Sequence, residues 1–145
     1  TFVDRQPDAL AFAAWNAAQQ PGLGPPPRTC VLDWSRETVD GAYDLVLASD
    51  VSYHRSHHRP LLRQLHRSLD SGGVLVHTDP VRELSGVFLS ELGRGAARRH
   101  WTQTVVFGGA RVDVRSTVAA RAPAVADDWS ARLGGSASQT GRSPA

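Results

Sequence analysis

Residues 42–54 read Ala-Tyr-Asp-Leu-Val-Leu-Ala-Ser-Asp-Val-Ser-Tyr-His, and this stretch decides the fold that we predict. The apolar run at residues 45–48 is typical of a strand buried on both faces, as in a parallel sheet covered by helices. Ser49 and Asp50 follow the run directly, and Tyr53 comes three residues after Asp50. Open α/β sheets bind ligands just beyond the carboxyl ends of their strands, so we expect the chemistry of the protein here.

The sequence on both sides of this stretch alternates between strand and helix patterns. Leucines recurring every four residues after Pro60 predict a helix, and Gly108-Gly109 predicts a hairpin turn. The predicted order β-α-β-β-α-β-α-β-β indicates an α/β protein. We expect a Rossmann-like, mostly parallel sheet with helices on both faces and an antiparallel hairpin at its C-terminal end. The predicted strands are residues 1–4, 29–32, 45–48, 74–76, 101–107 and 112–119, and the predicted helices are residues 7–19, 60–70 and 84–92.

Composition and charge narrow the class of protein. The 145 residues suffice for one domain, and all 16 basic residues are arginines, scattered so that the net charge is only +2. No basic stripe indicates nucleic acid as the partner, and no apolar run has the roughly 18–20 residues of a membrane span. The single cysteine, Cys30, is typical of a reducing compartment, so we expect a cytoplasmic protein.

The two ends of the chain lead to further expectations. Residue 1 is Thr and the sequence contains no Met, so we expect a fragment whose first strand is missing. From residue 122 onward the chain is rich in Ala, Ser and Gly. We therefore expect a partial domain over residues 1–121 and a disordered tail over residues 122–145, with at most a short turn near Trp129.

Polar and aromatic side chains follow several of the predicted strands. Asp4 ends the first strand, Asp33-Trp34 follows the second, and Asp79 follows the strand at residues 74–76. A carboxylate accepts hydrogen bonds from two ribose hydroxyls or from an adenine amine, and an indole offers a stacking face worth about 1–3 kcal/mol per base. Because the carboxyl ends of parallel strands lie at one edge of a sheet, these residues predict a nucleoside site.

Several short motifs resemble those of a known family. The chain is similar to the class I S-adenosylmethionine-dependent methyltransferases, and within them to the group of protein-lysine and nicotinamide N-methyltransferase-like proteins. The resemblance covers residues 1 to about 120, and the Asp-x-x-Tyr element after the strand at residues 45–48 is its most specific part. The motifs that carry the resemblance are Asp4, Ala9-Leu10 with Asn16, Leu32-Asp33-Trp34, residues 44–53, Gly72-Gly73-Val74-Leu75 and Asp79-Pro80-Val81-Arg82.

The resemblance implies a cofactor, S-adenosylmethionine, and a role for each matching residue. Asp4 would bind the ribose, Asp33 and Trp34 would hold the adenine, and Ser49 would line the methionyl side. For catalysis, the resemblance implies that Asp50 faces the acceptor amine and that Tyr53 walls the acceptor pocket. A protein lysine is the favoured acceptor; a small molecule is the alternative.

The family's first strand and its glycine-rich loop would precede Thr1. That loop brings backbone N–H groups to the methionine part of the cofactor. We therefore expect the chain by itself to bind the cofactor poorly and to be marginally stable. The third alternative for the function is that the chain is an inactive fragment or a domain that serves as an interaction module.

The same residues also have structural readings. Asp50 caps the next helix in one alternative, and Tyr53 is a packing residue in another. Arg82 either pairs with Asp79 or lines the substrate mouth. Three histidines at residues 54, 57 and 58 match no defined metal spacing, so we expect a solvated loop or helix start there and no metal site.

Overall fold

The computed structural model describes residues 1–20, 22 and 24–134. The chain divides into two compact units, Thr1–Asp40 and a larger unit that begins at Gly41, and each is described by itself. This division lies inside the single domain that the sequence predicts for residues 1–121.

The first unit is a short β-α-β segment. Strand β1 (Phe2–Asp4) leads into helix α1 (Pro7–Ala18), and strand β2 (Thr29–Val31) pairs with β1 in parallel. Pro7 stands at the first position of α1, where its missing N–H would have had no partner within the helix. The two strands and the helix confirm the prediction for this part, while the expected loop of residues 21–27 lies partly outside the described residues.

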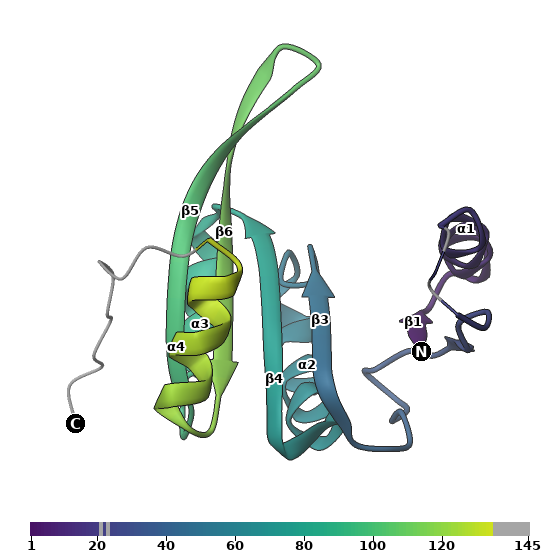
Figure 1. Ribbon diagram of the computed structural model, residues 1–145, viewed down its shortest axis with the longest axis horizontal. Helices are drawn as coiled ribbons and strands as arrows, with labels where there is room; N and C mark the ends of the chain where they lie inside the picture. The colour runs from purple at the N-terminus through teal and green to yellow at the C-terminus, as the bar shows by residue number, and fades with distance from the viewer. Residues whose placement is uncertain (21, 23, 135–145) are drawn as a thin grey trace. The chain divides into compact units, whose positions relative to one another are not determined.

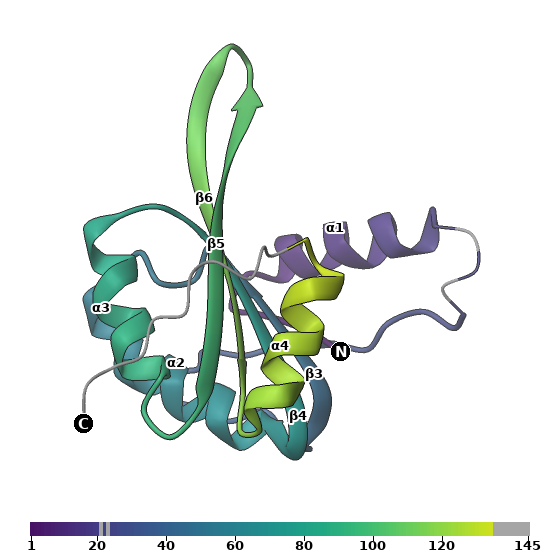
Figure 2. The same ribbon diagram turned by 60° about the vertical axis from the view of Figure 1, so that its left-hand side comes forward.

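The larger unit contains a sheet of four strands with helices on both faces. The strands are β3 (Tyr43–Ser49), β4 (Leu69–Pro80), β5 (Ala97–Phe107) and β6 (Ala110–Ala120), in the order β3-β4-β6-β5. Strands β3 and β4 are parallel, and the β5–β6 hairpin adds antiparallel pairs. Helices α2 (Arg55–Ser68) and α3 (Glu83–Leu92) lie on one face and α4 (Pro123–Arg132) lies on the other (Figure 1, Figure 2). The predicted α/β class and terminal hairpin are confirmed.

The hairpin turn forms as its glycines predict. Gly108 and Gly109 have φ values of 56° and 82°, a left-handed conformation that glycine adopts without steric cost. Strand β4 pairs with β6 only between Pro80 and Val74, so the outer part of the hairpin extends past the sheet as a two-stranded arm (Figure 1, Figure 2).

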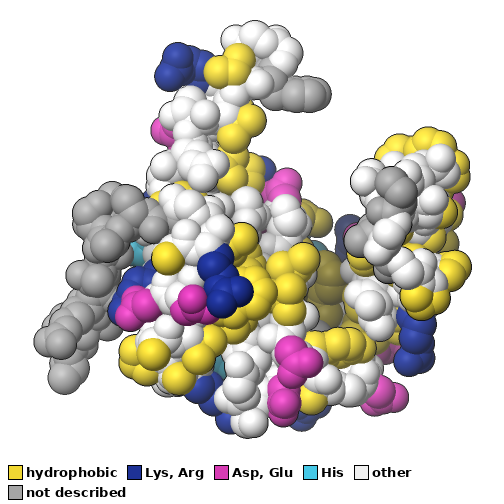
Figure 3. Space-filling view, in the orientation of Figure 1, with side chains coloured by type: hydrophobic (Ala, Val, Ile, Leu, Met, Phe, Trp, Pro, Cys, Tyr) yellow, Lys and Arg dark blue, Asp and Glu magenta, His cyan; other side chains and the backbone are white. Residues whose placement is uncertain are grey.

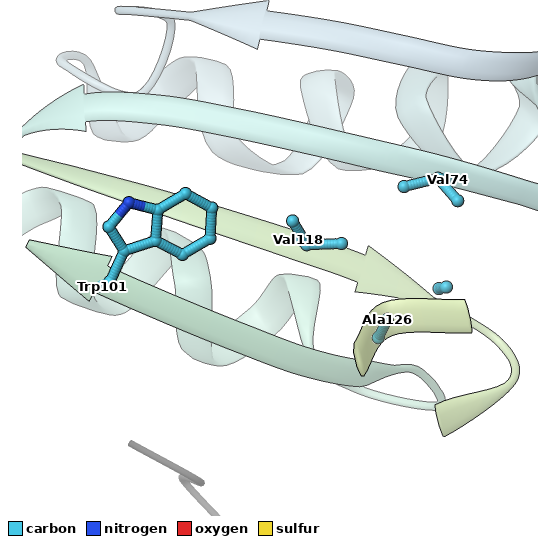
Figure 4. Packing of buried hydrophobic residues seen from close by; sticks show 5 residues of the cluster. Val74, Trp101, Val118 and Ala126 are labelled. Atoms are coloured by element: carbon cyan, nitrogen blue, oxygen red, sulfur yellow. The ribbon is translucent and has the colours of Figure 1, made fainter. Parts of the chain in front are cut away.

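The prediction of a disordered tail from residue 122 is wrong for residues 123–132, which form α4. Pro123 starts the helix, and Ala126 is fully buried against the sheet. Figure 4 shows Ala126 beside Val118 and Val74, with Trp101 further along the same face. The composition of the segment hid this helix, because its buried residues, Ala126 and Ser130, are small, and only Val125 and Trp129 add larger side chains to the contact.

Helix α2 begins at Arg55, five residues before the predicted start at Pro60. The earlier start is stabilised by packing. His58 is buried, its Nε2 lies 2.8 Å from the Ser52 carbonyl oxygen, and its ring meets Phe88 edge-on at 5.2 Å. Asp50 is therefore not the cap of this helix, whose N-cap position is His54. The alternative reading of Asp50 as a helix cap is wrong.

The apolar run of strand β3 predicted burial on both faces, and this prediction is wrong. The strand is an edge of the four-stranded sheet, and Leu47 is 71% exposed. Leu45 and Leu47 pair with Val74 and Val76, so they share the sheet face that α4 covers over β5 and β6. The helix does not reach β3, and hydrophobic side chains lie open on this face of the unit (Figure 3).

Candidate active site

The carboxyl ends of β3 and β4 lie next to each other. Ser49 pairs with Thr78 in the parallel register, and the Asp50 N–H donates to the Thr78 carbonyl at 2.9 Å. The residues that follow the two strands therefore share one edge of the sheet. Asp79 ends β4 at this edge, and Ser49 and Asp50 are exposed there.

Asp50 has an unusual backbone and an ion-pair partner. Its φ is +48°, the only such value for a non-glycine residue in the described part of the chain. Aspartate tolerates this region better than most residues, and such conformations cluster at functional sites. Arg82 Nη1 donates to Asp50 Oδ1 at 2.7 Å, and the two side chains are 41% and 55% exposed. The hydrogen bond to Asp50 raises the pKa of Arg82.

The ion pair settles one of the alternatives for Arg82, which bonds to Asp50 and makes no ion pair with Asp79 among the described residues. Arg82 directly precedes α3, with the extended backbone of an N-cap residue. The ion pair of Arg82 with Asp50 thereby connects the turn after β4 to the turn after β3.

Tyr53 is exposed and belongs to a small aromatic cluster. Its ring centroid lies 4.7 Å from that of His54 and 6.5 Å from that of His57, and the two histidine rings are 5.3 Å apart. These three side chains stand where the turn after β3 enters α2. Tyr53 therefore does not pack into the core, and its ring is available on the surface next to the strand ends.

Beneath the exposed pair lies a buried polar network. Ser52 and Ser85 are fully buried and their hydroxyl oxygens are 3.3 Å apart. The Ser52 hydroxyl donates to Asp79 Oδ2, and His77 Nε2 lies 3.4 Å from Asp79 Oδ1. The network ties the turn after β3 to the end of β4 and to the first turn of α3.

Burial and polar contacts, among them a backbone hydrogen bond from Val51, act in opposite directions on the pKa of Asp79. Burial by itself raises it, but the interactions with His77 and the hydrogen bond from Ser52 lower it more, so the carboxyl has a pKa below its usual value. A carboxylate that accepts hydrogen bonds is stabilised in its charged form. Asp79 is therefore a buried anion that holds its neighbours in place.

In the first unit, Asp4 ends β1 and Asp33 lies two residues beyond the end of β2. Because the two strands are parallel and Asp4 pairs with Val31, both carboxylates lie toward the same end of this small sheet. Asp4 Oδ1 accepts a hydrogen bond from the Gln6 N–H at 2.8 Å, just before α1. One carboxylate oxygen of Asp4 thus has a structural role at the strand end.

Asp33 organises the turn that follows β2. Its Oδ1 accepts hydrogen bonds from the Ser35 N–H at 2.9 Å and the Ser35 hydroxyl at 2.6 Å. Both bonds lower the pKa of Asp33, and the bond from the Ser35 hydroxyl has the larger effect. The charge of Arg36, whose Nε lies 3.9 Å from Asp33 Oδ2, lowers it further. Trp34 is half-buried beside it. The carboxylate stays charged in this exposed turn, next to an indole.

Sequence reasoning had missed Ser52, His77 and Ser85. They are separated by up to 33 positions, and only the parallel pairing of β3 with β4 and the packing of α3 bring them together. Of the network, only Asp79 carried a signal, since it follows a predicted strand. Over residues 1–20, 22 and 24–134 no group of three His, Cys, Asp or Glu side chains is arranged to hold a metal ion. No helix in this part of the chain is long and apolar enough to cross a membrane.

No protein-family model matches the chain, and no curated protein matches its sequence. Solved structures do match. Coclaurine N-methyltransferase bound to N-methylheliamine and SAH superposes with a TM-score of 0.57 and 9% identity over 81% of this chain. An rRNA methylase from Streptococcus thermophilus gives a TM-score of 0.51 and 13% identity over 80% of the chain. The chain spans 59% of the first structure and 69% of the second. The chain thus shares its fold with these two methyltransferase structures.

Proposed function

We propose that the protein transfers a methyl group from S-adenosylmethionine to an amine, most favourably a lysine side chain of another protein. The observation that carries the proposal is the position of Asp50. It stands at the carboxyl end of β3 in a left-handed conformation, exposed beside the end of β4. The fold and the family resemblance of the surrounding motifs support it.

The residues of the first unit suit a nucleoside. The second carboxylate oxygen of Asp4 has no hydrogen-bond partner among the described residues, so it is available for ribose hydroxyls. Asp33 is held as a charged acceptor next to Trp34, a pairing that suits an adenine amine and its ring. Ser49 would line the methionyl side. When bound, S-adenosylmethionine supplies a methyl group already activated on a sulfonium, so the protein contributes mainly proximity and orientation.

Asp50 would bind and orient the acceptor. An amine has to present a free lone pair to the methyl carbon, and a carboxylate that accepts one N–H of the amine aims that lone pair. Arg82 occupies the carboxylate in the structure, but exposed ion pairs contribute only about 0–1 kcal/mol. The acceptor amine can therefore displace Arg82 from Asp50 at small cost.

Tyr53 would form a wall of the acceptor pocket. Its exposed ring presents a π-face to a cation, an interaction of about 0.5–1 kcal/mol at exposed sites. His54 and His57 extend this aromatic surface. A surface that is open to solvent suits a side chain presented by another protein.

The proposal is tested by transfer of a radiolabelled methyl group, with the protein made from its complete gene and a cell lysate as acceptor. We expect label in protein bands and N-methyllysine after hydrolysis. Asp50→Asn should abolish most of the transfer, whereas Asp70→Asn, the same change at an exposed position at the start of β4, should not. Equal transfer by both variants would show that the assignment of Asp50 is wrong.

A small-molecule acceptor is the second candidate, favoured by one observation. The coclaurine N-methyltransferase structure with the TM-score of 0.57 carries N-methylheliamine, a small molecule. Label that appears only in the protein-free fraction of the lysate would select this candidate. Absence of label in both fractions, with a folded protein, would favour an inactive domain that serves as an interaction module.

A further inference from the structure

A pocket lies on the face of the sheet that α3 covers. It has a volume of about 220 Å³, below the range of drug-sized ligand sites, and so suits a small ligand. Helix α3 and strands β5 and β6 form its walls. Its lining residues are Gly86, Leu89, Ser90, Arg98, His100, Arg115 and Thr117.

The sheet register explains why the charged residues gather there. His100 on β5 pairs with Thr117 on β6, and Arg98 and Arg115 each stand two residues away along their strands. Since side chains alternate between the faces of a sheet, all four side chains project to the same face. The sequence pattern of each strand alone gives no sign of this cluster.

The lining of the pocket has cationic groups and no acid, and the nearest anion in the sheet register is the buried Asp79 on β4, opposite Arg115. Arg98, His100 and Arg115 line the pocket, and none of the lining residues is Asp or Glu. Burial lowers the pKa of His100, and the neighbouring charges of Arg115 and Arg98 lower it further. In the free pocket the charges of Arg98 and Arg115 disfavour protonation of His100, and a bound anion would offset this repulsion.

Two donors in the pocket wall lack protein partners. Thr117 is 1% exposed, and its hydroxyl has no hydrogen-bond partner among the described residues. The Nε of Arg115 is also buried without a partner. Arg98 is held in place at the pocket by a hydrogen bond from its Nη1 to the Leu89 carbonyl oxygen. Buried polar groups in native proteins nearly always have partners, so these two donors are available to a ligand or to water in the pocket.

We propose that this pocket binds a phosphate dianion, either inorganic phosphate or the phosphoryl end of a phosphomonoester. Arg115 and Arg98 supply charge-assisted hydrogen bonds, and the hydroxyls of Thr117 and Ser90 supply neutral ones. Guanidinium groups suit phosphate because their planar N–H forks match its oxygens. The site is separate from Asp50 and does not depend on the proposed methyl transfer.

The test is a titration of the isotope-labelled full chain with inorganic phosphate, and separately with glycerol 3-phosphate, followed by amide chemical shifts. We expect saturable shifts at His100 and Thr117 with one of the two probes or with both. The probe that binds more tightly identifies the free ion or the monoester as the ligand.

The variants are chosen so that charge alone cannot explain the result. Arg115→Gln should weaken binding at least tenfold, while Arg111→Gln, the same change at an exposed position of the same strand, should leave binding unchanged. Thr117→Val keeps the side-chain shape and should weaken binding several-fold, which protects the test if Arg115→Gln fails to fold. Shifts that do not saturate, or equal weakening by Arg111→Gln and Thr117→Val, would overturn the proposal.

Discussion

Asp50 and Asp79 end or follow two adjacent parallel strands, yet their surroundings are opposite. Asp50 is exposed, has a left-handed backbone and pairs with an exposed arginine. Asp79 is buried and held by Ser52 and His77. The difference teaches that a carboxylate at a strand end can serve either as a contact for a ligand or as an internal anchor. Here the anchor accepts a hydrogen bond from Ser52, which belongs to the turn that carries the contact.

The largest effect is expected from neutralising the anchor. Asp79→Asn leaves His77 without its acid and weakens the bond to Ser52, and loss of one partner of a buried pair costs about 3 kcal/mol or more. Denaturant unfolding measures this loss. A change below about 1 kcal/mol would mean that the network does not hold the turn in place.

Neutralising the contact should act on turnover and spare stability. On the proposed function, Asp50→Asn lowers methyl transfer about a hundredfold, because the amine is no longer aimed. Its free energy of unfolding should change by less than about 1 kcal/mol, as for other exposed ion pairs. Steady-state kinetics and denaturant unfolding on the same preparation separate the two effects. A large loss of stability would place Asp50 with Asp79 as a structural residue.

Ser52→Ala removes the hydroxyl that bonds the turn after Asp50 to the Asp79 carboxylate. The variant loses a buried hydroxyl that donates to a carboxylate, a bond of about 1.5–3 kcal/mol. We expect a loss of stability in the upper half of that range, since the buried Asp79 carboxylate loses a donor and a cavity of one oxygen remains. The turn after β3 should also exchange its amide hydrogens faster, which hydrogen exchange at Val51 and Tyr53 would detect.

Acid should reduce the contribution of the anchor. The pKa of Asp79 in the folded protein lies below its usual value of 3.8. Its charged form therefore adds stability above pH 3.8, and that stability is lost as the pH falls through the folded pKa. The difference in unfolding free energy between the wild type and Asp79→Asn should shrink over this interval. A difference that stays constant down to the acid limit would contradict the assignment.

The smallest effect is expected for Arg82→Gln. Loss of this exposed ion pair should change stability by less than about 1 kcal/mol. If Asp50 binds the acceptor amine, removal of the competing guanidinium lowers KM for that amine and leaves kcat nearly unchanged. A raised KM would show instead that Arg82 contacts the acceptor directly.

Much of the fold could be predicted from local patterns. Pro7 marks the start of α1, the leucines after Pro60 mark the buried side of α2, and Gly108-Gly109 marks the hairpin turn. Each of these signals depends on a few neighbouring residues, and the structure confirms each element. The roles of Asp4, Asp33, Trp34, Ser49, Asp50 and Tyr53 remain predictions, although the structure places each of them at or just beyond the carboxyl end of its strand.

Features that depend on distant partners could not be predicted in this way. The length of the apolar run in β3 suggested burial on both faces, but burial depends on which helix reaches the strand, and α4 covers β5 and β6 instead. Similarly, α4 itself is stabilised by contact with Val74 and Val118, which lie on strands formed by other parts of the chain.

The sequence by itself determined the alternation of strands and helices, the hairpin, and the placement of acids at strand ends, because backbone preferences and side-chain periodicity act over a few residues. Only the tertiary structure decided that Asp50 meets Arg82, that Asp79 is buried with His77 and Ser52, and that two arginines and a histidine share a pocket under α3. Those arrangements arise from strand register and helix docking, which join residues far apart in the chain and thereby set whether a charged side chain faces water, a partner or a ligand.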